Sequence, residues 1–207
     1  MKNLAILGAG GHGKVAADIA EQLGWNIHFF DLAFPKINKC GLWDIVGDEA
    51  SLIKHAAKYD AVFVAIGNNE IRAKKQQEFK ALGFAITSLI SPAATLSAHV
   101  DIGEGVLIVA NACINIGTKI SDGVIINTGA NIDHDNHIGE FSHISPGVNL
   151  AGEVNIGQRC WVGIGSTIIH QITVGDNVMV GAGTVIINDV PADVTVVGCP
   201  ARIARQR

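Results

Sequence analysis

A histidine-rich stretch in the second half of the chain, INTGANIDHDNHIGEFSHIS at residues 126–145, carries the residue types used in proton transfer and in metal binding. Histidine titrates near neutral pH, and a neighbouring carboxylate fixes its tautomer and raises its basicity. Here His134 is followed by Asp135, with His137 and His143 nearby. The stretch therefore allows three interpretations: a general base, a zinc site with three histidine ligands, or structural turns.

The stretch lies inside a strict six-residue repeat. Every sixth residue from Ile90 to Ile186 is Ile, Leu or Val, without an insertion, and the fifth position of each repeat is usually small or β-branched. Such a period is typical of a coil of three short strands per turn, in which each strand points one aliphatic residue inward. It predicts a triangular parallel β-helix with a coil of eighteen residues.

The repeat places His134 beside Gly152, because the two residues are one full coil apart. Stacked strands lie about 4.8 Å apart, so a bare backbone N–H would sit next to an imidazole. Acyl transfer needs such a pair: a base for the attacking group and a donor for the tetrahedral oxyanion. In the same repeat Asn136 replaces the usual small residue, and a break in a pattern often marks function.

His143 lies half a coil beyond His134 and is expected on another surface of the prism, where a threefold oligomer would bring the surfaces together. It is equally compatible with a buried, hydrogen-bonded side chain. The zinc alternative requires inward-converging histidines and an open coordination position. A zinc prism has no need of the separate domain that precedes the repeat.

The first half of the chain, residues 1–88, alternates short apolar strands with amphipathic helices, which predicts a parallel sheet with crossover helices. Strands are expected at 4–7, 26–31, 61–67 and 84–90, and the first helix at 14–24. The glycine turn GAGGHG at 8–13 matches G-x-G-x-x-G between a strand and a helix, where backbone amides bind phosphate. Asp31 ends the next strand, close to the position at which dinucleotide-binding folds place the acidic residue that hydrogen-bonds the ribose. The half is small, so one nucleotide is the expected ligand.

Composition excludes several classes of protein. The chain has 207 residues, 48% hydrophobic and 16% charged, with a formal charge of -4, so nothing indicates nucleic acid as a partner. Four widely spaced cysteines favour reduced thiols. No apolar run is long enough for membrane insertion or a signal peptide, so a soluble protein is expected, and the reduced thiols favour the cytoplasm.

Four blocks together resemble the bacterial sugar acetyltransferases of the PglD/NeuD type: the glycine loop with GHG, AIGNNEIR at 65–72, the histidine-rich stretch, and VVGCPAR at 196–202. The resemblance covers nearly the whole chain and is strongest to the PglD type. It implies a Rossmann-like UDP-sugar-binding domain at 1–88. It also implies a left-handed β-helix acetyltransferase domain at 89–207 that ends in a C-terminal tail, and a homotrimer with acetyl-CoA between subunits.

The resemblance also implies roles for particular residues. His134 would be the base, supported by Asp135, and Gly152 would hold the oxyanion. The UDP-sugar site would be shaped by Gly10, Gly11, His12, Asp31, Gly67 and Asn68. The acetyl-CoA groove would be lined by His143, Gly152, Ile164, Gly181 and Ala182. Arg202, Arg205 and Arg207 would meet CoA phosphates or form a solvated tail, and no metal is expected.

The implied reaction is direct acetyl transfer to the 4-amino group of a UDP-4-amino-4,6-dideoxy sugar, with a product of the UDP-N,N'-diacetylbacillosamine type. Residues 35–48 extend the linker after the second strand relative to the PglD type, which leaves the exact sugar open. Two alternatives remain: an O-acetyltransferase of a sialic-acid-like sugar, and a non-catalytic sugar-nucleotide or zinc-binding trimer.

Overall fold

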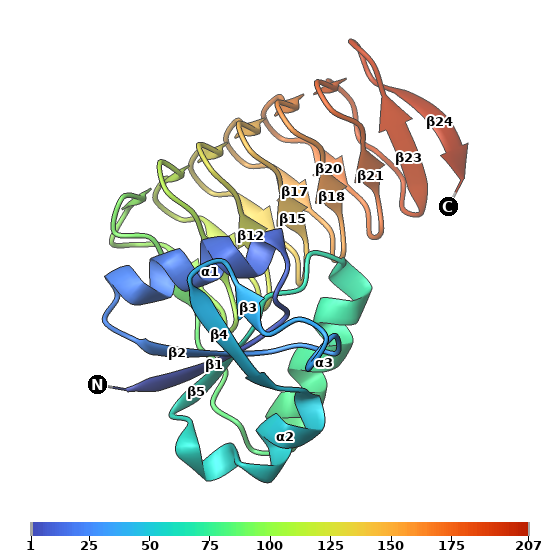
Figure 1. Ribbon diagram of the computed structural model, residues 1–207. Helices are drawn as coiled ribbons and strands as arrows, with labels where there is room; N and C mark the ends of the chain where they lie inside the picture. Colours follow the sequence, from blue (N-terminus) through green and yellow to red (C-terminus); the bar gives the residue numbers. More distant parts are fainter. Residues whose placement is uncertain (1, 207) are drawn as a thin grey trace. The chain divides into compact units, whose positions relative to one another are not determined.

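A computed structural model describes residues 2–206 and divides into two compact units, Met1–Pro92 and Ala93–Arg207. Each unit folds around its own buried residues, and Figure 1 shows the elements of both. In the part of the chain that is described, no helix has the length and hydrophobicity that a membrane span requires.

The first unit is built on a parallel sheet. Strands β1 (Asn3–Leu7), β2 (Asn26–Phe30) and β5 (Ala61–Val64) pair in parallel, and the sheet order is β3-β4-β2-β1-β5. The other elements are β3 (Lys39–Cys40), β4 (Trp43–Gly47), β6 (Leu89–Ile90), α1 (Gly11–Gln22), α2 (Glu49–Lys54), α3 (Asn69–Ala81) and the 3-10 turn η1 (Ala56–Lys58). A strand–helix–strand order with parallel pairing is Rossmann-like.

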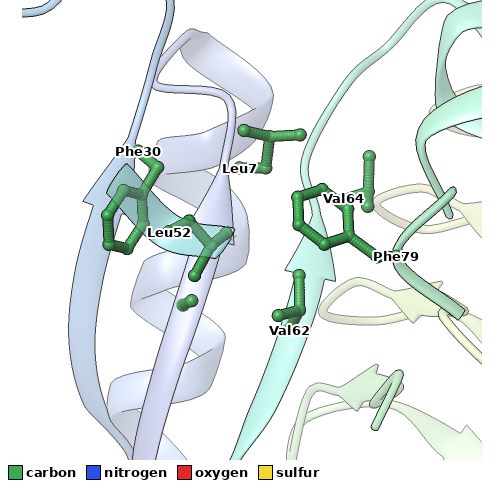
Figure 2. Close-up of a cluster of buried hydrophobic side chains, with 7 residues drawn as sticks. Leu7, Phe30, Leu52, Val62, Val64 and Phe79 are labelled. Atoms are coloured by element: carbon green, nitrogen blue, oxygen red, sulfur yellow. The ribbon is translucent and has the colours of Figure 1, made fainter. Parts of the chain in front are cut away.

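One face of this sheet packs on a cluster of apolar side chains from strands and helices (Figure 2). Leu7, Phe30 and Val64 come from three neighbouring strands, while Leu52 comes from α2 and Phe79 from α3. All are at most 4% exposed, so each contributes on the order of 1.5–3 kcal/mol of burial free energy. The cluster fixes the strand ends from which the glycine loop and the loop after β5 emerge.

Three boundaries in this unit differ from those expected. Residues 39–47 do not form a linker: they form β3 and β4, and β4 pairs in parallel with β2. Helix α1 begins at Gly11, so half of the expected glycine turn is the first helical turn. The segment 84–90 makes only an isolated bridge at Ile86 and the short β6.

The second unit is a parallel β-helix of two-residue strands. One sheet has the order β22-β19-β16-β13-β10-β7, the next β20-β17-β14-β11-β8, and the third contains β24-β23-β21-β18-β15-β12-β9. The strands of the first are Thr95–Leu96, Cys113–Ile114, Asn131–Ile132, Asn149–Leu150, Thr167–Ile168 and Val185–Ile186. Those of the second are Asp101–Ile102, Lys119–Ile120, His137–Ile138, Asn155–Ile156 and Thr173–Val174. Those of the third are Leu107–Ile108, Ile125–Ile126, His143–Ile144, Trp161–Val162, Met179–Val180, Val194–Val197 and Arg202–Gln206.

Pairing follows the expected eighteen-residue coil. Ile132 is in register with Leu150, and Leu150 with Ile168, and all three are buried. Aliphatic side chains thus stack inside the prism while the preceding residue of each strand faces outward. At the C-terminal end of the described chain, β23 and β24 extend one sheet as an antiparallel pair. Arg202 and Arg205 lie on exposed β24, and Arg207 lies outside the described residues.

Candidate active site

His134 and Asp135 form a hydrogen-bonded pair at the corner between β13 and β14. Nδ1 of His134 lies 2.8 Å from Oδ2 of Asp135. Side chains of consecutive residues on a strand point apart. Asp135 has φ 57, a left-handed conformation that turns the chain and lets the two side chains meet. Both side chains are exposed to solvent, so an incoming substrate can reach the ring.

Carboxylates around His134 make it a stronger base. The hydrogen bond that His134 donates to Asp135 is the main cause of a raised pKa for His134, with smaller contributions from the charges of Asp133, Asp135 and Glu153. Asp133 itself is held in place: its Oδ1 accepts hydrogen bonds from Asn115 Nδ2 and from the backbone N–H of His134, both at 2.9 Å. These two bonds lower the pKa of Asp133 and keep it charged.

Gly152 lies directly against the ring of His134. A Cβ at this position would be 2.6 Å from both Cε1 and Nε2, so only glycine leaves room for the imidazole. The Gly152 N–H donates no hydrogen bond to any acceptor within residues 2–206. A free amide beside a base is the arrangement that holds an oxyanion during acyl transfer.

The three histidines of the stretch occupy different parts of the coil. His134 is at a corner, while His137 on β14 contacts Ser121 and Asn155, and His143 is buried on β15. In residues 2–206 no three His, Cys, Asp or Glu side chains converge as a metal site. The inward-converging set that the zinc alternative requires is therefore not formed within the described chain.

His143 is held by its neighbours on the third sheet. Its Nε2 lies 3.1 Å from Asn127 Nδ2, and its ring makes an edge contact with Trp161 at a centroid distance of 4.3 Å. Burial and these contacts orient the ring.

The other residues expected to bind acetyl-CoA lie at the corner that follows this sheet. Ile164, 57% exposed, comes just after β18, and Gly181 and Ala182 come just after β21, which pairs with β18. Within one chain, Ile164, Gly181 and Ala182 lie at a different corner of the prism from His134 and Gly152. The structure therefore separates the residues expected at the acetyl-CoA groove into two groups.

In the first unit, the glycine loop is fixed by Asp31. Its carboxylate accepts the N–H of Ala9 at 2.8 Å and the N–H of Ala33 at 2.9 Å. Gly10 is the N-cap of α1 and Gly11 its first residue, so free amides lie at the helix start. Asp31 therefore shapes the loop, and its oxygens already have partners inside the protein.

His12 follows in the first turn of α1, and its Nε2 is buried without a hydrogen-bond partner among residues 2–206. Burial, assisted by the positive charge of Arg72, lowers the pKa of His12 to about 4. The ring is therefore neutral at physiological pH and can donate or accept one hydrogen bond at a ligand.

Arg72 organises the loop after β5, a role that the sequence did not reveal. Its guanidinium donates to the carbonyls of Ile66 and Gly67 at 3.0 and 3.1 Å, and to Asn69 Oδ1 at 2.9 Å. The side chain is 1% exposed, and burial lowers its pKa to about 9. Asn68, expected at the substrate site, caps α3 by accepting the N–H of Ile71 at 3.0 Å. The one signal in the sequence was the NNEIR block itself.

Comparisons with known proteins agree with this architecture. The family model "PglD N-terminal domain" matches residues 3–79, and "Bacterial transferase hexapeptide (six repeats)" matches 153–188. PerB from Caulobacter crescentus, solved with CoA and GDP-perosamine, is 35% identical with a TM-score of 0.94 and covers 99% of this chain and 98% of its own.

Two further solved structures are similar over the same length. The acetyltransferase domain of PglB from Neisseria gonorrhoeae, solved with acetyl coenzyme A, is 39% identical with a TM-score of 0.92 and 98% coverage of both chains. WeeI from Acinetobacter baumannii is 27% identical with a TM-score of 0.90, covering 98% of this chain and 100% of its own. The predicted fold class, a Rossmann-like domain followed by a left-handed parallel β-helix, is confirmed.

Proposed function

The chain belongs to the PglD-type family of bacterial sugar acetyltransferases, and on that premise we propose that it transfers the acetyl group of acetyl-CoA to the amino group of a nucleotide-linked sugar. The observation that carries the proposal is the juxtaposition of a basic imidazole, His134, with the free N–H of Gly152. The ligands named with the relatives, CoA, acetyl coenzyme A and GDP-perosamine, support both substrates.

The proposed reaction is a direct transfer. The sugar amine attacks the thioester carbonyl, and His134 accepts the proton that the nitrogen loses as the C–N bond forms. The N–H of Gly152 stabilises the negative charge on the carbonyl oxygen. The C–S bond then breaks, and the proton held by His134 passes to the leaving thiolate of coenzyme A. Asp135 holds Nδ1 of His134, so Nε2 is the atom that takes the proton.

We assign the nucleotide to the first unit. The helix start at Gly10 and Gly11 suits a diphosphate, and neutral His12 and the loop at Gly67 and Asn68 offer hydrogen bonds to the sugar. Asp31 acts through the loop it holds. The acceptor we propose is a UDP-4-amino-4,6-dideoxy sugar, with its 4-amino group acetylated.

We assign acetyl-CoA to the β-helix, along Gly152 at one corner and His143, Ile164, Gly181 and Ala182 at another. Because one chain separates these two groups, the groove is proposed to be completed by a neighbouring copy in a cyclic homotrimer in the cytoplasm. Sedimentation equilibrium with and without acetyl-CoA tests the trimer, and a monomer with full activity would exclude the shared groove.

The test of the activity is acetyl-CoA-dependent release of thiol with a panel of UDP-, GDP- and dTDP-linked amino sugars, with the mass gain of one acetyl group on the product. His134→Ala is expected to lower kcat by on the order of a hundredfold or more. His137→Ala, an exposed histidine three residues away, is the matched control and keeps full turnover. Acetylation of a hydroxyl analogue in preference to the amine would favour the O-acetyltransferase, and no product with any sugar would contradict the proposal.

A further inference from the structure

Asn136 is a buried amide at a repeat position that other coils fill with small or aliphatic side chains. It is 1% exposed inside the prism, where equivalent positions hold residues such as Ala130, Val148 and Val154. Burying an amide without hydrogen bonds costs about 1–3 kcal/mol, so its partners are informative. The side chain lies directly behind the corner that carries His134 and Asp135.

The amide nitrogen of Asn136 joins two successive coils. Nδ2 donates to the backbone carbonyl of Asp133 at 2.8 Å and lies 3.2 Å from that of His134, both in its own coil. It also donates to the carbonyl of Ala151, one coil further on, at 2.9 Å. One side chain therefore touches the backbone of the candidate base and the residue that precedes Gly152.

The bond to Ala151 determines where the Gly152 N–H points. The carbonyl of Ala151 and the N–H of Gly152 belong to the same planar peptide group, in which C=O and N–H point in opposite directions when the bond is trans. Only Phe34–Pro35 and Cys199–Pro200 are cis within the described residues. Because the carbonyl points inward to Asn136, the N–H points outward, on the side where the imidazole of His134 lies.

Hydroxyl residues at the same repeat position make a simpler contact. Ser142 Oγ donates to the carbonyl of Gly157 at 2.7 Å, and Ser166 Oγ to that of Gly181 at 3.0 Å. A hydroxyl has one proton and links to the next coil only, whereas an amide has two and also reaches its own coil. Among these residues, Asn136 is the one whose hydrogen bonds connect the backbone at His134 with the peptide group of Ala151 and Gly152.

We propose that Asn136 is a positioning residue for acetyl transfer, which sets the distance between the His134 imidazole and the outward Gly152 N–H. The inference rests on the proposed function, because it assigns Asn136 a role only through those two groups. Asn136 orients these two groups before substrate binds, because its hydrogen bonds to Asp133, His134 and Ala151 all lie within the β-helix.

The test compares Asn136→Val and Asn136→Ser with the control Ser142→Val. Valine is already an ordinary residue at this repeat position. Asn136→Val is therefore expected to lower the melting temperature by no more than Ser142→Val does. We expect kcat to fall on the order of tenfold or more, because small misplacements of catalytic groups are costly. KM for both substrates should change less than about threefold. Asn136→Ser keeps the link to Ala151 but not that to His134, and its kcat should be intermediate.

Three results would overturn the inference. Unchanged kcat in Asn136→Val, with His134→Ala inactive, removes Asn136 from the mechanism and leaves the proposed function intact. A loss of kcat matched by an equal loss in Ser142→Val, or explained by a lowered melting temperature in both Asn136 variants, shows a purely structural role. Full turnover in His134→Ala contradicts the proposed function and the inference with it.

Discussion

The carboxylate of Asp135 occupies the space directly over Gly117, one coil earlier in the β-helix. Gly117 has φ +78, and a Cβ built on it would collide with Oδ1 of Asp135. On the other side, Gly152 leaves room for the ring of His134. The pair of side chains is therefore flanked by two glycines: Gly117 lies one coil before Asp135, and Gly152 lies one coil after His134.

Gly117→Ala is expected to displace Asp135 and lower kcat. The substitution adds backbone strain of about 1–2 kcal/mol at a left-handed residue and a clash with the carboxylate. Gly129→Ala is the matched control, because Gly129 has φ +63 and no atom within 4 Å of an added Cβ. Both variants should lose similar thermal stability, and only Gly117→Ala should lose turnover. Equal turnover in the two would show that Asp135 does not depend on Gly117.

Asp135→Asn should lower the pKa of His134, because the hydrogen bond to the Asp135 carboxylate is the largest cause that raises it. A general base works in its neutral form, so kcat/KM rises with pH through the pKa of the base. The acid limb of the profile is therefore expected to move to lower pH, while the plateau falls roughly tenfold or more as the ring becomes less basic and less well oriented.

The shift is measured independently by NMR titration of the His134 ring in the two proteins. His137 serves as the internal reference in the same spectra. An acid limb that stays in place while the ring titrates lower would mean that another group controls the profile.

Gly152→Ala places a methyl group 2.6 Å from two atoms of the His134 ring. The ring must move away from the Gly152 N–H, so kcat is expected to fall on the order of a hundredfold. Binding of the nucleotide sugar, measured by calorimetry, should be unchanged, because the proposed site for it is in the first unit. Retained kcat would exclude Gly152 as the oxyanion donor.

The β-helix could be predicted because its geometry repeats with its sequence. Counting by sixes places Ile132, Leu150 and Ile168 in one inward column and places His134 beside Gly152, and the register agrees. No count, however, reveals that Asp135 adopts φ 57, that Gly117 lies beneath it, or that the amide of Asn136 reaches the carbonyl of Ala151. These contacts depend on corner conformations, which the period does not specify.

The first unit has no such period, and its boundaries were less accurate. The sequence predicts a longer linker at residues 35–48, whereas the structure forms β3 and β4 there, two short strands separated by Gly41. The alternation of Ile45 and Gly47, buried, with exposed Asp44 and Val46 was the signal available. The NNEIR block marks this region in the sequence, but it does not predict that the guanidinium of Arg72 is buried, because arginine in a helix is usually a surface residue.

His12 gives a pH dependence of stability that can be tested without any substrate. Burial lowers its pKa from the ordinary value of 6.5 to about 4 in the folded protein, so the unfolded chain binds more protons between these values. Stability from this residue is present above pH 6.5 and is lost as pH falls toward 4, by about 3 kcal/mol in total.

The measurement is urea unfolding at several pH values for the native protein and for His12→Gln, which has no proton to gain in this range. The free energy of unfolding should fall more steeply on acidification in the native protein than in the variant, because carboxylates titrate in both and cancel in the difference. A His12 ring that titrates near 6.5 by NMR, together with parallel stability curves, would mean that its burial is not maintained in solution.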